Sequence, residues 1–206
     1  MSVVFHRKIV RAGSRLALHV TPTPKRLPWR IYRTPYRIFL AEMLLIRTRA
    51  DVVARVYEDI YKKYPNILAL ASAQESDLRM VLYPLGLAKR TPYIIMAASY
   101  IYKTHKGKIP RSVDALLKVP GLGMYTASAI AVFAYHQDVV PSDVNILRFV
   151  ARLTGLEMEN KTKGSKQLME LAPFLAKKNT GLSIEKLLDF TRLVCRPETL
   201  NVKNAI

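Results

Sequence analysis

Apolar residues recur along most of this chain at intervals of three and four positions, which is the period of an amphipathic helix. No pair of alternating runs flanks a tight turn, so the pattern offers no convincing β-hairpin. Four prolines between residues 21 and 35 rule out a continuous helix there and indicate a connector. The pattern therefore predicts an all-α protein, with helices over residues 3–19, 36–47, 50–64, 75–82, 92–105, 112–119, 124–135, 144–153, 165–178 and 184–194.

A glycine-rich turn, Pro120 to Gly123, separates two of these predicted helices. Its glycines permit positive φ and a close approach of a partner to the backbone. The helix that follows begins with amide groups that have no acceptor within the helix, and such a corner binds anions. In a basic protein we expect the anion to be a DNA phosphate. The candidate contacts are Gly121, Gly123, Met124 and Thr126.

Composition favours a nucleic-acid partner. The 206 residues are 50% hydrophobic, and 33 Lys and Arg against 15 Asp and Glu give a net charge of +18 that is spread along the chain. An acidic protein, a membrane surface or a generally basic proteome are the alternatives. The longest apolar runs fall far short of the roughly 20 residues that a membrane span needs. A single cysteine, Cys195, excludes an internal disulfide and favours a cytoplasmic location.

Glu42 is the only acidic residue among the first fifty, which contain eleven Lys and Arg. Its helical neighbours at three and four positions are all apolar. A carboxylate on such a stripe has to be paired, protonated or open to a cleft, and burial would raise its pKa toward that of a general acid or base. The alternative is a structural ion pair with a nearby arginine, and spacing alone favours the ion pair.

Asp143 presents a similar choice. It precedes a predicted helix and, like Ser112 before another, is a good N-cap. A carboxylate held there by the helix dipole could also stabilise a cationic sugar. Tyr125 lies in the first turn after the glycine corner, where an aromatic residue usually serves packing. Other loop residues are either ordinary solvated groups or DNA contacts: Arg47, Arg49, Leu87, Lys89 and Arg90.

Three segments in one order resemble a known family. Residues 27–48 contain Glu42, residues 119–126 form the glycine corner, and residues 143–145 read Asp-Val-Asn. Together they resemble the helix-hairpin-helix DNA glycosylases of the endonuclease III superfamily, especially the archaeal thymine-mismatch and bacterial adenine-mismatch enzymes. The resemblance extends from residue 27 to Cys195.

The resemblance implies a two-lobed fold with the active site in the cleft between the lobes. Residues 34–137 would form a six-helix lobe, and residues 1–33 and 138–206 a discontinuous second lobe. A monomer would bind double-stranded DNA with a flipped-out base in the cytoplasm, associated with the nucleoid. Glu42 would protonate the base or orient water, Asp143 would stabilise the sugar cation, and Asn145 would support Asp143. Leu87 and Arg47 would fill the gap in the duplex.

Two departures from the family narrow the expected chemistry. Tyr125 stands where bifunctional members have a Schiff-base lysine, and a phenol forms no imine, so strand cleavage is not expected. Most relatives hold a 4Fe–4S cluster with four cysteines, of which only Cys195 has a counterpart here. We therefore expect no iron–sulfur cluster and no other metal.

The pattern Leu-Leu-x-Arg-Thr-x-Ala over residues 44–50, together with Tyr125, is closer to the thymine-mismatch enzymes. The expected activity is base excision repair, with release of thymine and uracil mispaired with guanine. One alternative is an adenine glycosylase that acts on A·G or A·8-oxoguanine pairs. Another is a catalytically silent DNA-binding module, although such a module gains nothing from acidic residues in a basic cleft.

Overall fold

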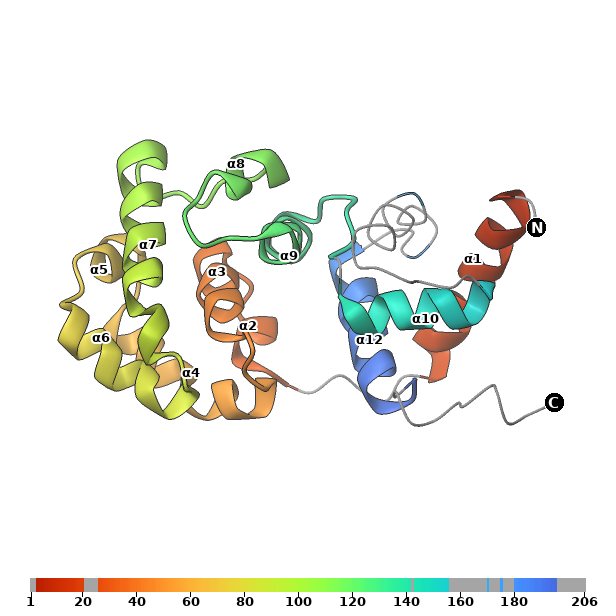
Figure 1. Cartoon of the computed structure of the whole chain (residues 1–206), viewed down its shortest axis with the longest axis horizontal. Helices are drawn as coiled ribbons and strands as arrows, with labels where there is room; N and C mark the ends of the chain where they lie inside the picture. The colour runs from red at the N-terminus through yellow and green to blue at the C-terminus, as the bar shows by residue number, and fades with distance from the viewer. Residues whose placement is uncertain are drawn as a thin grey trace. The chain divides into compact units, whose positions relative to one another are not determined.

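The computed structural model describes residues 3–20, 26–141, 143–155 and 180–195, together with residues 170 and 175. Every regular element in these residues is helical, which confirms the predicted all-α class (Figure 1). The chain divides into two compact units. Arg26–Tyr135 form the first, here called the hairpin unit, and Met1–Lys25 with His136–Ile206 form the second, the terminal unit.

The hairpin unit contains most of the helices. They are α2 (Pro28–Ile31), α3 (Pro35–Leu44), α4 (Ala50–Lys63), α5 (Ile67–Ala71), α6 (Glu75–Leu82), η1 (Tyr83–Leu85), η2 (Ala88–Arg90), α7 (Thr91–His105), α8 (Val113–Leu117) and α9 (Met124–Tyr135). The helices predicted over residues 75–82 and 124–135 match α6 and α9 at both ends. The pattern did not reveal α2 and α5, because four and five residues are too few to display a helical period.

α3 and α9 form the centre of this unit. They pack against each other, and α9 presents buried residues from Thr126 to Phe133, four of them alanine or serine. Small side chains allow two helices to approach closely. α4 and α8 flank this pair, while α7 packs on α5 and α6 (Figure 1). The largest fully buried side chains include Phe39 of α3 and Tyr57 of α4, and the others come from α3 to α7.

The terminal unit contains α1 (Val3–Val20), α10 (Val144–Thr154) and α12 (Thr180–Leu193), which pack against one another. The rings of Phe149 and Phe190 meet edge to face at 5.5 Å between centroids. α1 approaches α10 so closely that a methyl group at Gly13 would lie 2.5 Å from Cδ1 of Leu153. The helix predicted over residues 165–178 lies outside the described residues, apart from 170 and 175.

The two units differ in their bounds from the predicted lobes at both ends. Residues 26–33, expected in the second lobe, cluster with the hairpin unit, and residues 136–137, expected in the six-helix lobe, cluster with the terminal unit. The physical reason for the first difference is Trp29, which is buried and packs on Tyr57 of α4 with 5.1 Å between ring centroids. An aromatic pair of this kind ties α2 to the hairpin unit.

Within the described part of the chain, no helix has the combination of length and apolar character needed to cross a membrane.

Candidate functional site

Glu42 lies deep in the hairpin unit. All residues of α3 from Arg37 to Leu44 are buried, and Glu42 keeps only 5% of its surface exposed. The helix begins at Pro35 because Thr34 caps it, accepting a hydrogen bond from the amide of Arg37. Glu42 is therefore buried on a helix whose neighbouring residues are also buried. Its role as a general acid or base stays a prediction.

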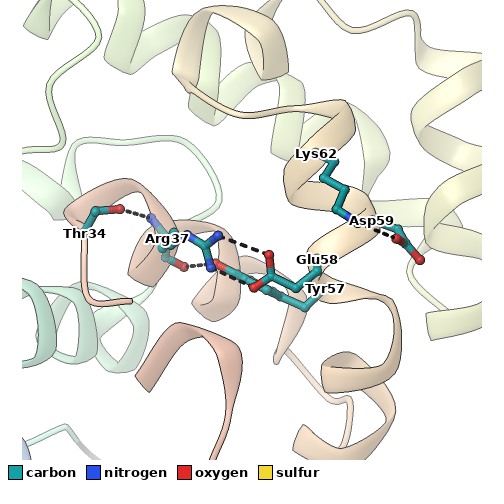
Figure 2. Close-up of polar contacts among 6 residues, drawn as sticks. All are labelled: Thr34, Arg37, Tyr57, Glu58, Asp59 and Lys62. Carbon is teal, nitrogen blue, oxygen red and sulfur yellow. Dashed lines mark hydrogen bonds and ion pairs between the residues drawn. The ribbon is translucent and has the colours of Figure 1, made fainter. Parts of the chain in front are cut away.

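Arg37 is the arginine on the same helix, and its ion-pair partner is Glu58 of α4 (Figure 2). Nη1 and Nη2 donate to the two carboxylate oxygens at 2.8 and 3.1 Å. The guanidinium lies 3.8 Å from the ring centroid of Tyr61, and the hydroxyl of Tyr57 donates to the Arg37 carbonyl at 2.7 Å. The hydrogen bonds to Glu58 raise the pKa of Arg37 above its usual value. These contacts fasten α3, and with it Glu42, to α4.

The glycine corner joins α8 to α9. Ser112 caps α8 as predicted, accepting from the amide of Ala115 at 3.3 Å. Gly121 has φ of 80°, a conformation that favours glycine, and a Cβ there would lie 3.5 Å from Cβ of Tyr93. The corner therefore rests against the first turn of α7. At Gly123 a Cβ would meet nothing within 4 Å, so this backbone is open to a partner.

The residues that follow the corner differ in exposure. The side chain of Met124 is exposed, and that of Tyr125 is half-buried. Thr126 is buried, so its side chain is not available for the predicted contact with DNA, and only its main chain could take part.

Two loops of the hairpin unit lie side by side. Arg47 follows α3 with φ of 57°, a strained conformation for a residue other than glycine, and its side chain is exposed. The hydroxyl of the next residue, Thr48, donates to the carbonyl of Leu85 in η1 at 3.3 Å. The structure therefore brings the Arg47 loop next to the loop that precedes Leu87.

The remaining predicted cations differ in how available they are. Arg49 is exposed, but its guanidinium makes two hydrogen bonds of 3.1 Å to Asp51. Lys89 is exposed on η2. Arg90 is half-buried, and its Nε has no hydrogen-bond partner among the described residues. Lys89 is therefore the best placed of the three to meet a partner.

Leu87 is not exposed, contrary to the prediction. It keeps 4% of its surface, and its amide donates to the carbonyl of Leu82 at 3.2 Å. The hydrophobic effect explains this position, because an apolar side chain gains free energy by burial within the unit. The exposed aromatic residue of this loop is Tyr83, at 76%. Sequence reasoning missed Tyr83.

Asp143 caps α10 in the terminal unit. Its Oδ1 accepts from the amides of Asn145 and Ile146 at 2.7 and 3.3 Å, which confirms the predicted N-cap. The side chain is part-buried. These two hydrogen bonds fix the position of the Asp143 side chain at the start of α10.

Arg148 secures the residue next to Asp143. Its Nη2 donates to Oδ1 of Asn145 at 2.9 Å. The same guanidinium donates to the carbonyl of Cys195, through Nε at 3.0 Å and Nη2 at 2.8 Å, and to the carbonyl of Thr191 at 3.3 Å. Arg148 thus ties the start of α10 to the end of α12. Arg148, which sequence reasoning did not single out, therefore holds the side chain of Asn145.

The residues present do not fit an iron–sulfur cluster. The sequence has one cysteine, whereas a cluster of this kind needs four thiolates. Sγ of Cys195 accepts a hydrogen bond from Nη1 of Arg152 at 3.2 Å. Within the described ranges, no group of three or more His, Cys, Asp or Glu side chains could hold a metal ion.

The sequence of this chain is similar to those of known proteins. The pattern of the HhH-GPD superfamily base excision DNA repair proteins matches residues 40–174. A thymine-DNA glycosylase of Aeropyrum pernix is 34% identical over 83% of this chain and 79% of its own length. An adenine DNA glycosylase of Mycobacterium tuberculosis is 35% identical, but over 61% of this chain and 42% of its own length.

The fold of this chain also matches that of a solved structure. The structure of a thermostable thymine-DNA glycosylase superimposes with a TM-score of 0.82 at 25% identity, covering 99% of this chain and 94% of that one. The likeness thus extends over nearly the whole of both chains. The chain belongs to the HhH-GPD superfamily of base excision DNA repair proteins.

Proposed function

We propose that this protein is a monofunctional DNA glycosylase that removes thymine and uracil mispaired with guanine in duplex DNA. The observation that carries the proposal is a carboxyl group, Glu42, buried in a protein of a base excision repair family. A relative that shares most of the chain is a thymine-DNA glycosylase, which favours thymine over adenine as the base. Uracil lacks only the 5-methyl group, so a pocket that admits thymine admits uracil.

Two carboxyl groups would share the chemistry. Glu42 would deliver a proton to the departing base or orient the attacking water. Asp143 would stabilise positive charge on the sugar as the glycosidic bond breaks. Its amide hydrogen bonds fix the position of this side chain before the reaction starts, which is the condition for electrostatic catalysis. Asn145, held by Arg148, would keep Asp143 in place.

Strand cleavage would not follow base removal. A β-lyase step needs an amine that forms an imine with the sugar, and the first turn of α9 offers the phenol of Tyr125. Borohydride added during turnover should therefore trap no covalent protein–DNA product. We further propose that the protein acts as a monomer without an iron–sulfur cluster.

The test of the proposed function is a panel of duplexes with central G·T, G·U, A·G and A·8-oxoguanine pairs. Each is incubated with the protein and then treated with alkali, which cleaves at abasic sites. We expect cleavage of the strand that carries T or U opposite G, and none without alkali. Cleavage at adenine would establish the adenine glycosylase instead. Binding without cleavage of any duplex would establish a DNA-binding module.

The glycine corner would bind a DNA phosphate through main-chain amides. Gly121→Ala should lower both the stability of the protein and its affinity for duplex, because alanine at φ of 80° costs about 1–2 kcal/mol. Gly123→Ala is the matched variant, since its methyl group meets no protein atom within 4 Å. It should leave the melting temperature unchanged and lower affinity alone. Unchanged affinity in Gly123→Ala would remove this corner from the DNA interface.

The two adjoining loops would meet the duplex around the flipped base. Arg47 would hold the orphaned guanine, and because Leu87 is buried, the exposed Tyr83 would stack in the gap. Base–aromatic stacking amounts to about 1–3 kcal/mol, so Tyr83→Ala should slow thymine excision by roughly 5- to 150-fold in single-turnover assays.

The substrate provides the control for this variant. A thymine in a preformed bulge needs no stack to be opened, so Tyr83→Ala should process it nearly as fast as the unmodified protein does. Tyr102→Ala removes another exposed tyrosine, near the far end of α7, and should change neither rate. Equal slowing of Tyr83→Ala on both substrates would mean that Tyr83 does not act by stacking.

A further inference from the structure

α1 has two different faces. Val10, Ser14 and Ala17 are buried, and the hydroxyl of Ser14 donates to the carbonyl of Val10 at 2.7 Å. Gly13 on the same side lies against Leu153 of α10. On the described part of the helix, this is the side that packs on α10 and α12.

The opposite face is basic. At 100° per residue, positions 8, 11, 15 and 19 fall within an arc of about 80°, facing away from the buried positions. They are Lys8, Arg11, Arg15 and His19, here called the α1 stripe. Lys8, Arg15 and His19 are exposed, and Arg11 between them is half-buried. α1 contains no acidic residue, so no carboxylate on the helix itself offsets this charge.

The form of the stripe decides which ligand it suits. Lys8 and Arg15 are seven residues apart, or roughly 10 Å along the helix axis. A DNA strand presents a phosphate about every 3.4 Å of its own axis, so the stripe spans several phosphates of one backbone. An amphipathic helix on a membrane inserts its apolar face into the lipid, but here that face is already packed against α10 and α12. A regular polyanion fits the stripe better than a bilayer does.

We propose that the α1 stripe binds the phosphate backbone of duplex DNA and gives the terminal unit a contact of its own. The proposal rests on DNA being the substrate class of the proposed function, but it concerns residues to which that function assigns no part. The contact is electrostatic and independent of sequence. It would hold the unit that contains Asp143 on DNA of any sequence, with or without a mismatch.

The experiment measures affinity for an undamaged duplex over a range of salt concentrations, by fluorescence anisotropy. Each phosphate contact contributes about 0.9 to the slope of log K against log salt. The double variant Lys8→Gln/Arg15→Gln should therefore reduce the slope by about 1.8 and weaken binding most at low salt. The melting temperature should not change, because both side chains lie outside the packed face of α1.

A matched control separates local contact from total charge. Lys62→Gln/Arg79→Gln also removes two positive charges, from exposed side chains that face Asp59 and Glu75 on α4 and α6. It should leave the slope nearly unchanged. An equal fall in slope for both double variants would overturn the proposal, because net charge alone would then explain the effect. Loss of binding to anionic phosphatidylglycerol vesicles, with DNA affinity intact, would overturn it in favour of a lipid surface.

The readout does not depend on catalysis. If the slope falls in the α1 variant while no duplex of the mismatch panel is cleaved, the stripe binds DNA and the proposed glycosylase activity is wrong. If G·T duplexes are cleaved while the slope is unchanged, the glycosylase stands and the stripe takes no part in binding.

Discussion

Glu42→Gln is expected to slow thymine release from a G·T duplex by roughly 10²- to 10⁴-fold in single-turnover assays, the usual contribution of a general acid or base. Glutamine has nearly the same shape but cannot exchange a proton. Because glutamine keeps the volume of this buried side chain, a melting curve measured beside the rate separates lost proton transfer from lost stability. Affinity for the mismatched duplex should remain close to that of the unmodified protein, as measured by anisotropy.

Glu58→Gln on α4 is the matched control, which should lower stability without slowing excision. It leaves the largely buried guanidinium of Arg37 without its carboxylate, so the melting temperature should fall. The loss should be smaller than the roughly 3–5 kcal/mol of a fully buried pair, since the side chain of Glu58 keeps 41% exposure. The excision rate of the folded protein should not change. A Glu42→Gln protein that excises thymine at the original rate would show that Glu42 is structural.

Asp143 allows its two possible roles to be separated by a pair of substitutions. Asparagine caps helices about as well as aspartate, so Asp143→Asn should keep the amide hydrogen bonds of α10 and the stability of the protein. It removes the charge, and we expect the excision rate to fall by roughly 10²- to 10³-fold, as when one preorganised electrostatic group is lost. Asp143→Ala removes cap and charge together and should also cost about 1 kcal/mol of stability.

Thermal melting and single-turnover excision, measured on both Asp143 variants, distinguish the roles. Full activity in Asp143→Asn would reduce Asp143 to a helix cap. Equal stability of the two variants would mean instead that the cap contributes nothing measurable, and the charge would be the only role left.

The features that could be predicted from sequence are those set by nearby residues. Helical periods gave α6 and α9 at their observed ends, and the caps at Ser112 and Asp143 depend on amides two or three residues away. The buried setting of Glu42 followed from its own helix. Contacts across the fold could not be read in this way.

Leu87 and Tyr83 illustrate positions whose exposure depends on contacts across the fold. A leucine after a glycine in a basic loop is expected to be exposed, and only the folded unit buries it. The pair Arg37–Glu58 joins residues 21 positions apart on different helices. The only sequence signal for this pair was Arg37, a charged residue inside an apolar run. A charged residue in an apolar run also drew attention to Glu42.

The carbonyls that Arg148 binds, at the end of α12 and just after it, have a consequence for which substitutions the protein tolerates. Arg148 binds main-chain carbonyls at positions 191 and 195, and every residue type carries such a carbonyl. Substitutions at these two positions that preserve the end of α12 therefore leave the support of Asn145 intact. Arg148 has no such freedom, because lysine lacks the planar fork that reaches Asn145 and two carbonyls at once. The support of Asn145 therefore requires arginine at position 148, whereas the two carbonyls do not depend on residue type.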